Sequence, residues 1–157
     1  MQHDVSLRIR LLNPTSRKRA ALSAMEAEYT KAVSLLLEAA KELDTTSLGR
    51  LHREAYHLVK GEVSLPSESL RVALNQTCHI MRSWKARLER RCKAKSPVIK
   101  RLQPIGIGTR GYRIIRDGDR FILRLTTANG FLWLPLKSNA YSRPYLEALA
   151  DGKAHQG

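Results

Sequence analysis

The chain has 157 residues, of which 43% are hydrophobic, and a formal net charge of +14. This length accommodates one domain with its own core, or two small modules that share one, and the apolar fraction excludes a disordered chain. The charge favours a polyanionic partner, either nucleic acid or an anionic membrane. No apolar stretch is long enough to cross a bilayer, and residues 1–4 lack the layout of a signal peptide.

The first half of the chain is predicted to hold one strand followed by three helices. Residues 4–12 alternate apolar and polar side chains, as a strand does, with Ser6, Arg8 and Arg10 on the polar face. Apolar residues then recur at helical spacing in three segments, from Thr15 or Ser16 to Asp44, from Leu48 to Gly61 and from Ser67 to Ser96. Pro97 ends the last segment, because proline disfavours helix in the residue before it. Three such helices can bury their apolar stripes against one another as a small bundle.

The second half is predicted to form a sheet. Residues 112–116 are expected to be a strand, Asp117-Gly118 a tight turn and residues 121–125 the returning strand. Asn129-Gly130 indicates a second hairpin that leads into a strand over residues 131–136, and a short helix is expected at residues 145–149. A single strand at residues 4–12 cannot stand alone, so we expect it to join this sheet. The predicted fold class is α+β, with a helical bundle inserted after the first strand of an antiparallel sheet.

The positive charge is concentrated in one part of the chain. Residues 20–70 hold five Lys or Arg against eight acids, a net of −3, whereas residues 71–125 hold fifteen against three, a net of +12. Within the latter, residues 83–101 carry eight Lys or Arg and a single acid, Glu89. A run of charge is often only a solvated face, but so uneven a distribution favours a functional basic surface.

No arrangement of residues indicates catalysis by this chain alone. The five histidines, at positions 3, 52, 57, 79 and 155, lack the spacing of a zinc site, and the two cysteines form no CxxC motif. Cys78 and Cys92 would lie about 21 Å apart on one helix, too far for a disulfide, so we expect a reducing, cytoplasmic compartment. Cys78 and His79 are neighbours and therefore point to different faces. Gly106-Ile107-Gly108 lacks the Lys-Ser/Thr of a phosphate-binding loop.

Stretches of the chain, taken in order, resemble the N-terminal part of TnpB (OrfB) proteins, which are transposon-encoded RNA-guided DNA nucleases related to type V CRISPR effectors. These stretches are RIRLLNPTSRKRAAL, LPSESLRVALNQTCHIMRSWKARL, KSPVIKR and GYRIIRDGDRFIL. Typical members have Tyr-Pro-Thr where Asn13-Pro14-Thr15 stands, and a Leu-Pro-Ser-capped helix with an Ala-Leu pair, here Ala73-Leu74. A Pro-Arg-Phe-Lys-like segment follows, and Val98-Ile99 departs from its usual Arg-Phe. The resemblance spans residues 5–137.

This resemblance implies an architecture and a set of partners. In the family, the first and later strands form a wedge domain, an oligonucleotide-binding-like β-barrel, with a helical recognition lobe inserted between them. The corresponding parts here are residues 1–12 (first wedge strand), 13–95 (recognition lobe) and 96–157 (remaining wedge strands, expected to be incomplete). The Mg²⁺-dependent RuvC nuclease domain of the family has no counterpart in these residues, so no cofactor is expected in this chain. The implied partners are guide RNA, target DNA and the remaining wedge and RuvC portion, or a separately encoded half, in a prokaryotic cytoplasm.

The resemblance, together with the basic pattern, also assigns candidate binding residues. Contacts to the RNA backbone are expected from Arg8, Arg10, Arg87, Arg90, Arg91, Lys93, Lys95, Lys100, Arg101, Arg110 and Arg113. Contacts to target DNA, including the short motif beside the target that the protein itself reads, are expected from Ser67, Ser69, Arg71, Asn75 and Arg82. Arg and Asn suit guanine and adenine edges, and a helix N-terminus favours a phosphate.

Two other functions remain open from the sequence. The chain is alternatively a stand-alone RNA- or DNA-binding regulator without a nuclease, or a basic subunit of a ribonucleoprotein. A membrane surface is disfavoured, because the basic residues follow a helix end and strands and do not flank one apolar helix stripe. Trp84 is predicted to pack in the core with Leu74, Met81 and Leu88, with base stacking as the less favoured alternative.

Overall fold

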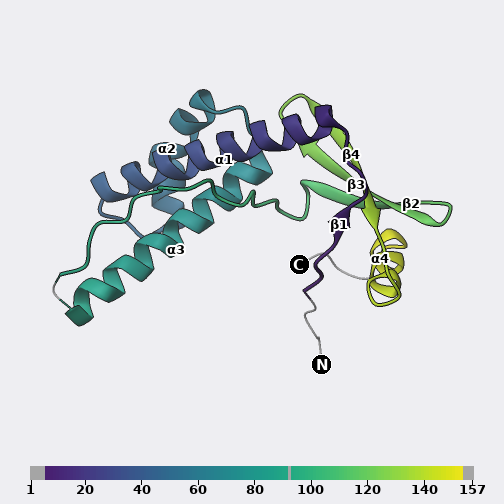
Figure 1. Ribbon diagram of the computed structural model, residues 1–157. Helices are drawn as coiled ribbons and strands as arrows, with labels where there is room; N and C mark the ends of the chain where they lie inside the picture. The colour runs from purple at the N-terminus through teal and green to yellow at the C-terminus, as the bar shows by residue number, and fades with distance from the viewer. Residues whose placement is uncertain (1–5, 92, 154–157) are drawn as a thin grey trace. The chain divides into compact units, whose positions relative to one another are not determined.

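The computed structural model describes residues 6–91 and 93–153. The chain divides into two compact units. The sheet unit comprises the described residues up to Ala21 and from Thr109 onward, and the helical unit comprises Leu22–Gly108. The elements follow in the order β1 (Arg10–Leu11), α1 (Ser16–Glu42), α2 (Leu48–Glu62), α3 (Ser67–Arg91), β2 (Tyr112–Asp117), β3 (Arg120–Thr127), β4 (Gly130–Lys137) and α4 (Arg143–Ala150) (Figure 1).

The sheet unit contains one antiparallel sheet with the strand order β1-β4-β3-β2. Two hairpins join β2 to β3 and β3 to β4, and the first turns at Gly118, whose φ of 58° suits a residue without a side chain. β1 lies beside β4, with Arg10 opposite Lys137 and Leu11 opposite Leu136. The prediction that the N-terminal strand joins the C-terminal strands is therefore confirmed at Arg10 and Leu11, and α1, α2 and α3 lie between β1 and β2 in the chain.

The sheet is open, so the expectation of a closed oligonucleotide-binding-like barrel is wrong for this chain. β1 and β2 are the two edges of the sheet and do not pair with each other. The N-terminal strand is also shorter than predicted, since only Arg10 and Leu11 pair, although the Leu12 N–H still donates to the Pro135 carbonyl at 2.7 Å. Asn13 then adopts a φ of 41°, which turns the chain toward α1. Residues 4 and 5 of the predicted strand lie outside the described residues.

The core of the sheet unit lies between one face of the sheet and α4. Alternate side chains of a strand share a face, and the register places Ile114, Phe121 and Leu136 on the same one. These three residues pack with Leu146 of α4, which is fully buried. The helix predicted at residues 145–149 is confirmed, and it begins two residues earlier, at Arg143.

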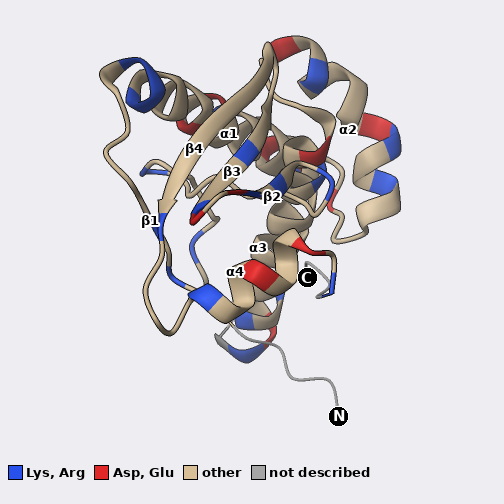
Figure 2. Ribbon diagram, turned by 90° about the vertical axis from the view of Figure 1, so that its right-hand side faces the viewer, with Lys and Arg blue, Asp and Glu red and all other residues tan. Residues whose placement is uncertain are grey.

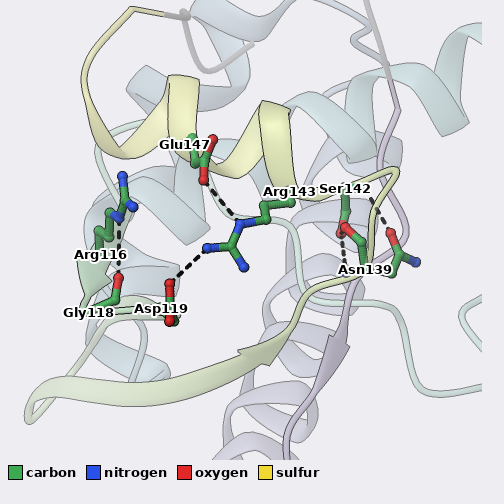
Figure 3. A network of polar contacts seen from close by, with 7 residues as sticks. All are labelled: Arg116, Gly118, Asp119, Asn139, Ser142, Arg143 and Glu147. Carbon is green, nitrogen blue, oxygen red and sulfur yellow. Dashed lines mark hydrogen bonds and ion pairs between the residues drawn. The ribbon is translucent and has the colours of Figure 1, made fainter.

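Arg143 joins the start of α4 to the turn between β2 and β3. Its Nη2 donates to Asp119 Oδ1 at 3.0 Å and its Nε donates to Glu147 Oε1 at 3.1 Å (Figure 3). These two carboxylates, Asp119 foremost, raise the pKa of Arg143. In the preceding turn, the Ser142 N–H donates to Asn139 Oδ1 at 2.8 Å and the Asn139 N–H donates to Ser142 Oγ at 3.0 Å. Asp119, one of the three acids in the basic part of the chain, is thus engaged in a structural contact.

The helical unit is formed by α2, α3 and most of α1, which bury their apolar stripes as the spacing predicts. Ser47 caps α2, since its side chain accepts a hydrogen bond from the Arg50 N–H. The buried side chains of the three helices include Met25, Tyr29, Val33, Leu36, Leu37, Leu51, Val59, Leu70, Leu74, Cys78 and Met81.

The third helix ends earlier than predicted, at Arg91 and not at Ser96. Arg90 and Arg91 follow Arg87 by three and four positions, and like charges at these spacings destabilise a helix. Residues 93–108, called the connection below, have no regular secondary structure.

A chain of partly buried hydrogen bonds holds the end of the connection on α1 and α3. The hydroxyl of Tyr29, a residue with no exposed surface, donates to Gln76 Oε1 at 2.8 Å, and Gln76 Nε2 donates to Gln103 Oε1 at 2.9 Å. The Gln103 N–H donates to Thr30 Oγ1 at 2.8 Å. Burial raises the pKa of Tyr29 to about 12, so its hydroxyl remains a donor at all ordinary pH values. The connection therefore runs back along the helices in a fixed path.

The close approach of Gly106 to these helices gives a stability prediction. A Cβ at this position would meet Val72 Cγ1 and would lie 2.6 Å from the Tyr29 hydroxyl oxygen. Gly106→Ala should therefore lower the free energy of unfolding by about 1–3 kcal/mol through overpacking, measured as the midpoint of urea unfolding. Gly61→Ala is the matched control, because nothing lies within 4 Å of its Cβ, and it should stabilise by about 0.5–1 kcal/mol. Equal effects of the two changes would show that the connection does not pack at Gly106.

Candidate nucleic-acid interface

The described residues contain no candidate metal site. Within them, no group of three or more His, Cys, Asp or Glu side chains is close enough to bind a metal. Cys78 is 2% exposed, and burial raises the pKa of its thiol, so it is neither accessible nor activated. The adjacent His79 is exposed, which separates the two side chains, and Cys92 lies outside the described residues. No described helix has the length and apolar character of a membrane span.

Basic side chains follow the end of α3 and the connection. Six of the predicted RNA-binding residues there are exposed, and we call them the basic run: Arg87, Arg90, Lys93, Lys95, Lys100 and Arg101. The side chain of Arg91, a seventh predicted residue, is not among those described. Within residues 6–91 and 93–153, no ion pair involves any member of the basic run. These charges are therefore available to an external anion.

Other cations nearby are already neutralised, which sets the basic run apart. Lys85 pairs with Asp44 at 2.8 Å, and this contact lowers the pKa of Asp44. Lys41 pairs with Glu38 at 2.6 Å. Asp44 and Glu38 thus pair with cations outside the basic run, whose members have no such partner among the described residues.

Two hydrogen bonds fix the backbone that carries the basic run. Trp84 Nε1 donates to the Ala94 carbonyl at 3.3 Å, and Lys41 Nζ donates to the Pro97 carbonyl at 3.4 Å. Trp84 is half-buried, so it belongs only in part to the buried stripe of α3. Its indole also contacts the connection, which returns from the end of the helix. The connection is thereby held against α3 and α1 while its charged side chains remain exposed.

The other four predicted RNA-binding residues belong to the sheet unit. Arg8 precedes β1, Arg10 lies in β1, Arg110 precedes β2 and Arg113 lies in β2. All four are exposed, and none takes part in an ion pair with another described residue. The predicted residues therefore form two sets, one in each unit, and Figure 2 shows the basic positions on the strands in blue.

The residues predicted to contact DNA lie on α3, and they differ in accessibility. Arg71 and Asn75 are exposed and four residues apart, so they lie on the same side of the helix, and Ser67 is exposed at its start. Arg82 is exposed, and its Nη2 donates to the Thr46 carbonyl at 3.3 Å. Ser69 is only 1% exposed, so a phosphate cannot reach its hydroxyl.

The start of α3 is also a poor phosphate site for an electrostatic reason. Glu68 lies in the first turn, where a carboxylate already complements the positive end of the helix dipole. A phosphate at the same place would be repelled by that carboxylate. Ser69 is therefore not placed for the expected phosphate contact, whereas the other four residues predicted to contact DNA are exposed: Ser67, Arg71, Asn75 and Arg82.

The structure exposes an aromatic surface that the sequence reasoning missed. Phe131 and Trp133 on β4 are 56% and 46% exposed, whereas Leu134 and Leu136 of the same strand are buried. Arg124 of β3 lies over the Phe131 ring, with its Cζ 4.6 Å from the ring centroid. The signal was the alternation of Phe131, Trp133 and Pro135 with leucines, which places both aromatic rings on the face opposite the core.

Comparison with known proteins adds no family assignment. A scan of the chain against protein-family models finds no match, and a search of curated proteins also finds none. The likeness to TnpB proteins therefore rests on the motifs and on their order.

Ser69 gives a prediction that separates a structural role from a DNA-binding one. Its buried Oγ has no hydrogen-bond partner among the described residues, so Ser69→Ala should raise the free energy of unfolding by about 1 kcal/mol. The shift in the urea midpoint at unchanged slope measures it. Ser67→Ala, at an exposed position in the same turn, should change stability by less than about 0.5 kcal/mol. A lower midpoint for Ser69→Ala would mean that the hydroxyl has a partner and contributes to the fold.

Proposed function

We propose that this chain binds RNA through phosphate contacts along the basic run. We further propose that it serves as the guide-RNA- and target-DNA-binding N-terminal part of a TnpB-like RNA-guided nuclease. The observation that carries RNA binding is the basic run itself, six exposed cations without ion-pair partners among the described residues, on a backbone held by Trp84 and Lys41. If these side chains only interacted with water, there would be no reason for them to lack ion-pair partners or for hydrogen bonds to hold the backbone between them.

The number of cations sets the strength and the kind of binding. Each phosphate neutralised releases condensed counterions, so six contacts would lower the affinity by roughly 10³ between about 50 and 200 mM salt. Phosphate contacts fix the position of a nucleic acid and do not read its sequence. The basic run therefore suits the backbone of a structured RNA and leaves sequence recognition to other surfaces.

Two features support the specific role within a TnpB-like protein. The helices are inserted between β1 and the other three strands, which is the order of parts that the resemblance implies. Arg71 and Asn75 lie exposed on one side of α3, with the side-chain chemistry that recognises guanine and adenine in a major groove. Cleavage in that family belongs to the RuvC domain, and we assign no residue of this chain to it.

RNA binding is tested by the salt dependence of a variant. In Arg90→Ala/Lys93→Ala/Lys95→Ala, three phosphate contacts are lost, so the slope of log affinity against log salt should fall by about 2–3. The affinity for a hairpin RNA, measured by fluorescence anisotropy over a salt series, gives this slope.

The matched control removes the same charge from the helix α2. Arg50→Ala/Arg53→Ala/Lys60→Ala also removes three exposed cations, but from a region whose net charge is negative. Its slope should remain within experimental error of the unchanged protein. Equal losses in the two variants would mean that only total charge matters and that the basic run is a solvated face.

DNA-motif reading by α3 is tested with a library of duplex DNA of random sequence. With the chain bound to hairpin RNA, Asn75→Ala should relax the preference at one base pair, because a bidentate contact contributes about 1–3 kcal/mol of discrimination. Arg82→Ala should weaken the binding of all sequences alike. If the sequence preference of Asn75→Ala equals that of the unchanged protein, the proposal that α3 reads DNA is wrong, and the proposal of RNA binding is unaffected.

A further inference from the structure

The face of the sheet opposite α4 combines aromatic rings and cations. By the strand register, Arg113, Arg124 and Trp133 form one row across β2, β3 and β4, and Thr126 and Phe131 form the next row. Arg10 and Lys137 lie opposite each other at the other end of the same face, and both are exposed. We call this the open face; its aromatic end is formed by Phe131, Trp133, Arg113 and Arg124.

The pairing of Arg113 with Arg124 indicates an anion site on the open face. The two residues are direct cross-strand partners, and like charges in this position destabilise a sheet. Neither arginine forms an ion pair with a carboxylate in the described part of the chain. An anion bound between the two guanidinium groups would remove this repulsion.

The aromatic rings beside this pair are positioned for stacking. Single exposed apolar residues are common on protein surfaces and need no explanation. Here two large rings are two positions apart on one strand, about 7 Å along it, and a guanidinium already lies over one of them. Stacking on aromatic rings and on arginine planes, next to phosphate contacts, is how proteins bind unpaired bases.

We propose that the open face binds unpaired nucleotides of RNA, with bases stacked on Phe131 and Trp133 and a phosphate between Arg113 and Arg124. The proposal rests on the RNA binding proposed above and assigns a second, base-contacting surface to it. RNA is favoured over DNA because its loops and bulges leave bases unstacked, whereas the bases of duplex DNA are paired.

Charge disfavours the other possible occupants of the open face. A second copy of this chain packed face to face would bring arginines of both copies together, at a net charge of +14 each. A nucleic acid strand supplies bases that can stack on the two rings and phosphates that complement the arginines.

Tryptophan fluorescence tests the proposal directly, because stacking of a base on the indole quenches its emission. The probe is a single-stranded RNA of about 12 nucleotides without internal pairing, within the range of single-strand binding sites. The tryptophan emission of the unchanged protein should fall as this RNA is added. Trp133→Phe should lose that quenching, since Trp84 is then the remaining tryptophan. Trp84 contacts the backbone of the basic run, so RNA bound there can quench it to a small extent. Quenching as strong in Trp133→Phe as in the unchanged protein would overturn the assignment.

Affinities of variants for the same RNA separate stacking from general effects. Loss of one stacked base should weaken binding by roughly 5- to 150-fold in Trp133→Ala, and Trp133→Phe should retain most of the affinity. Tyr141→Ala is the matched control, because Tyr141 is an aromatic residue 65% exposed in the same unit and outside the open face. Its affinity should be unchanged. A blunt-ended RNA duplex, which has no unpaired bases, should bind all three variants as it binds the unchanged protein.

A substitution in the arginine pair separates a binding role from a structural one. Arg113→Thr removes a like-charge pair and places a strand-favouring residue in β2, so the melting temperature should rise while the affinity for single-stranded RNA falls. A fall in both quantities would mean that Arg113 supports the fold, and the phosphate site would then be discarded.

The remaining outcomes distinguish this proposal from the broader one. If the protein binds hairpin RNA with the full salt slope but Trp133→Ala does not weaken single-strand binding, only the open face proposal fails. If neither RNA binds, both proposals fail. Tighter Trp133-dependent binding of single-stranded DNA of the same sequence would assign the face to DNA. A change in the mass of the protein by light scattering in Trp133→Ala, without a change in RNA affinity, would assign it to a second copy.

Discussion

The buried hydroxyl of Tyr29 is the contact on which the path of the chain through the helical unit depends. A buried phenol needs a hydrogen-bond partner, and the partner, Gln76, in turn binds Gln103 of the connection. These bonds bring Gly106 back beside Tyr29, which lies within about two turns of the point where α1 enters the unit. The chain therefore leaves the helical unit close to where it entered, as an insertion between β1 and β2 requires.

In the two proposals above, the basic run and the open face have different roles because their chemistry differs. The basic run offers long, exposed cations and no aromatic ring, so it suits a phosphate backbone whatever its sequence. The open face offers two rings and a pair of arginines held at fixed strand positions. Rigid strands hold such groups in place before binding, so less conformational entropy is lost there than on the connection.

Much of the fold follows from the sequence pattern, but the parts that depend on distant pairing do not. Helical spacing and the Asn129-Gly130 turn locate the helices and a hairpin, because these are local signals. The length of β1 depends on β4, far along the chain, so alternation at residues 4–12 overstates it. Ser69 is polar at a position that tertiary packing buries, and the resemblance alone placed it at a phosphate. The alternation in β4 encodes its outward aromatic face, but the apolar leucines between the rings make the whole segment resemble a buried strand.

The shortness of β1 leaves most of β4 without a neighbour on its outer side. β1 pairs only with Leu136 and Lys137, so among the described residues the backbone of Phe131–Leu134 has no strand beyond it on that side. Such an edge is a template for pairing with another chain. At low ionic strength the positive charge keeps copies apart, but salt screens that repulsion within a few ångströms at high concentration. High ionic strength, which would release the nucleic acid of the proposed function, therefore also removes the protection of this edge against strand-to-strand aggregation.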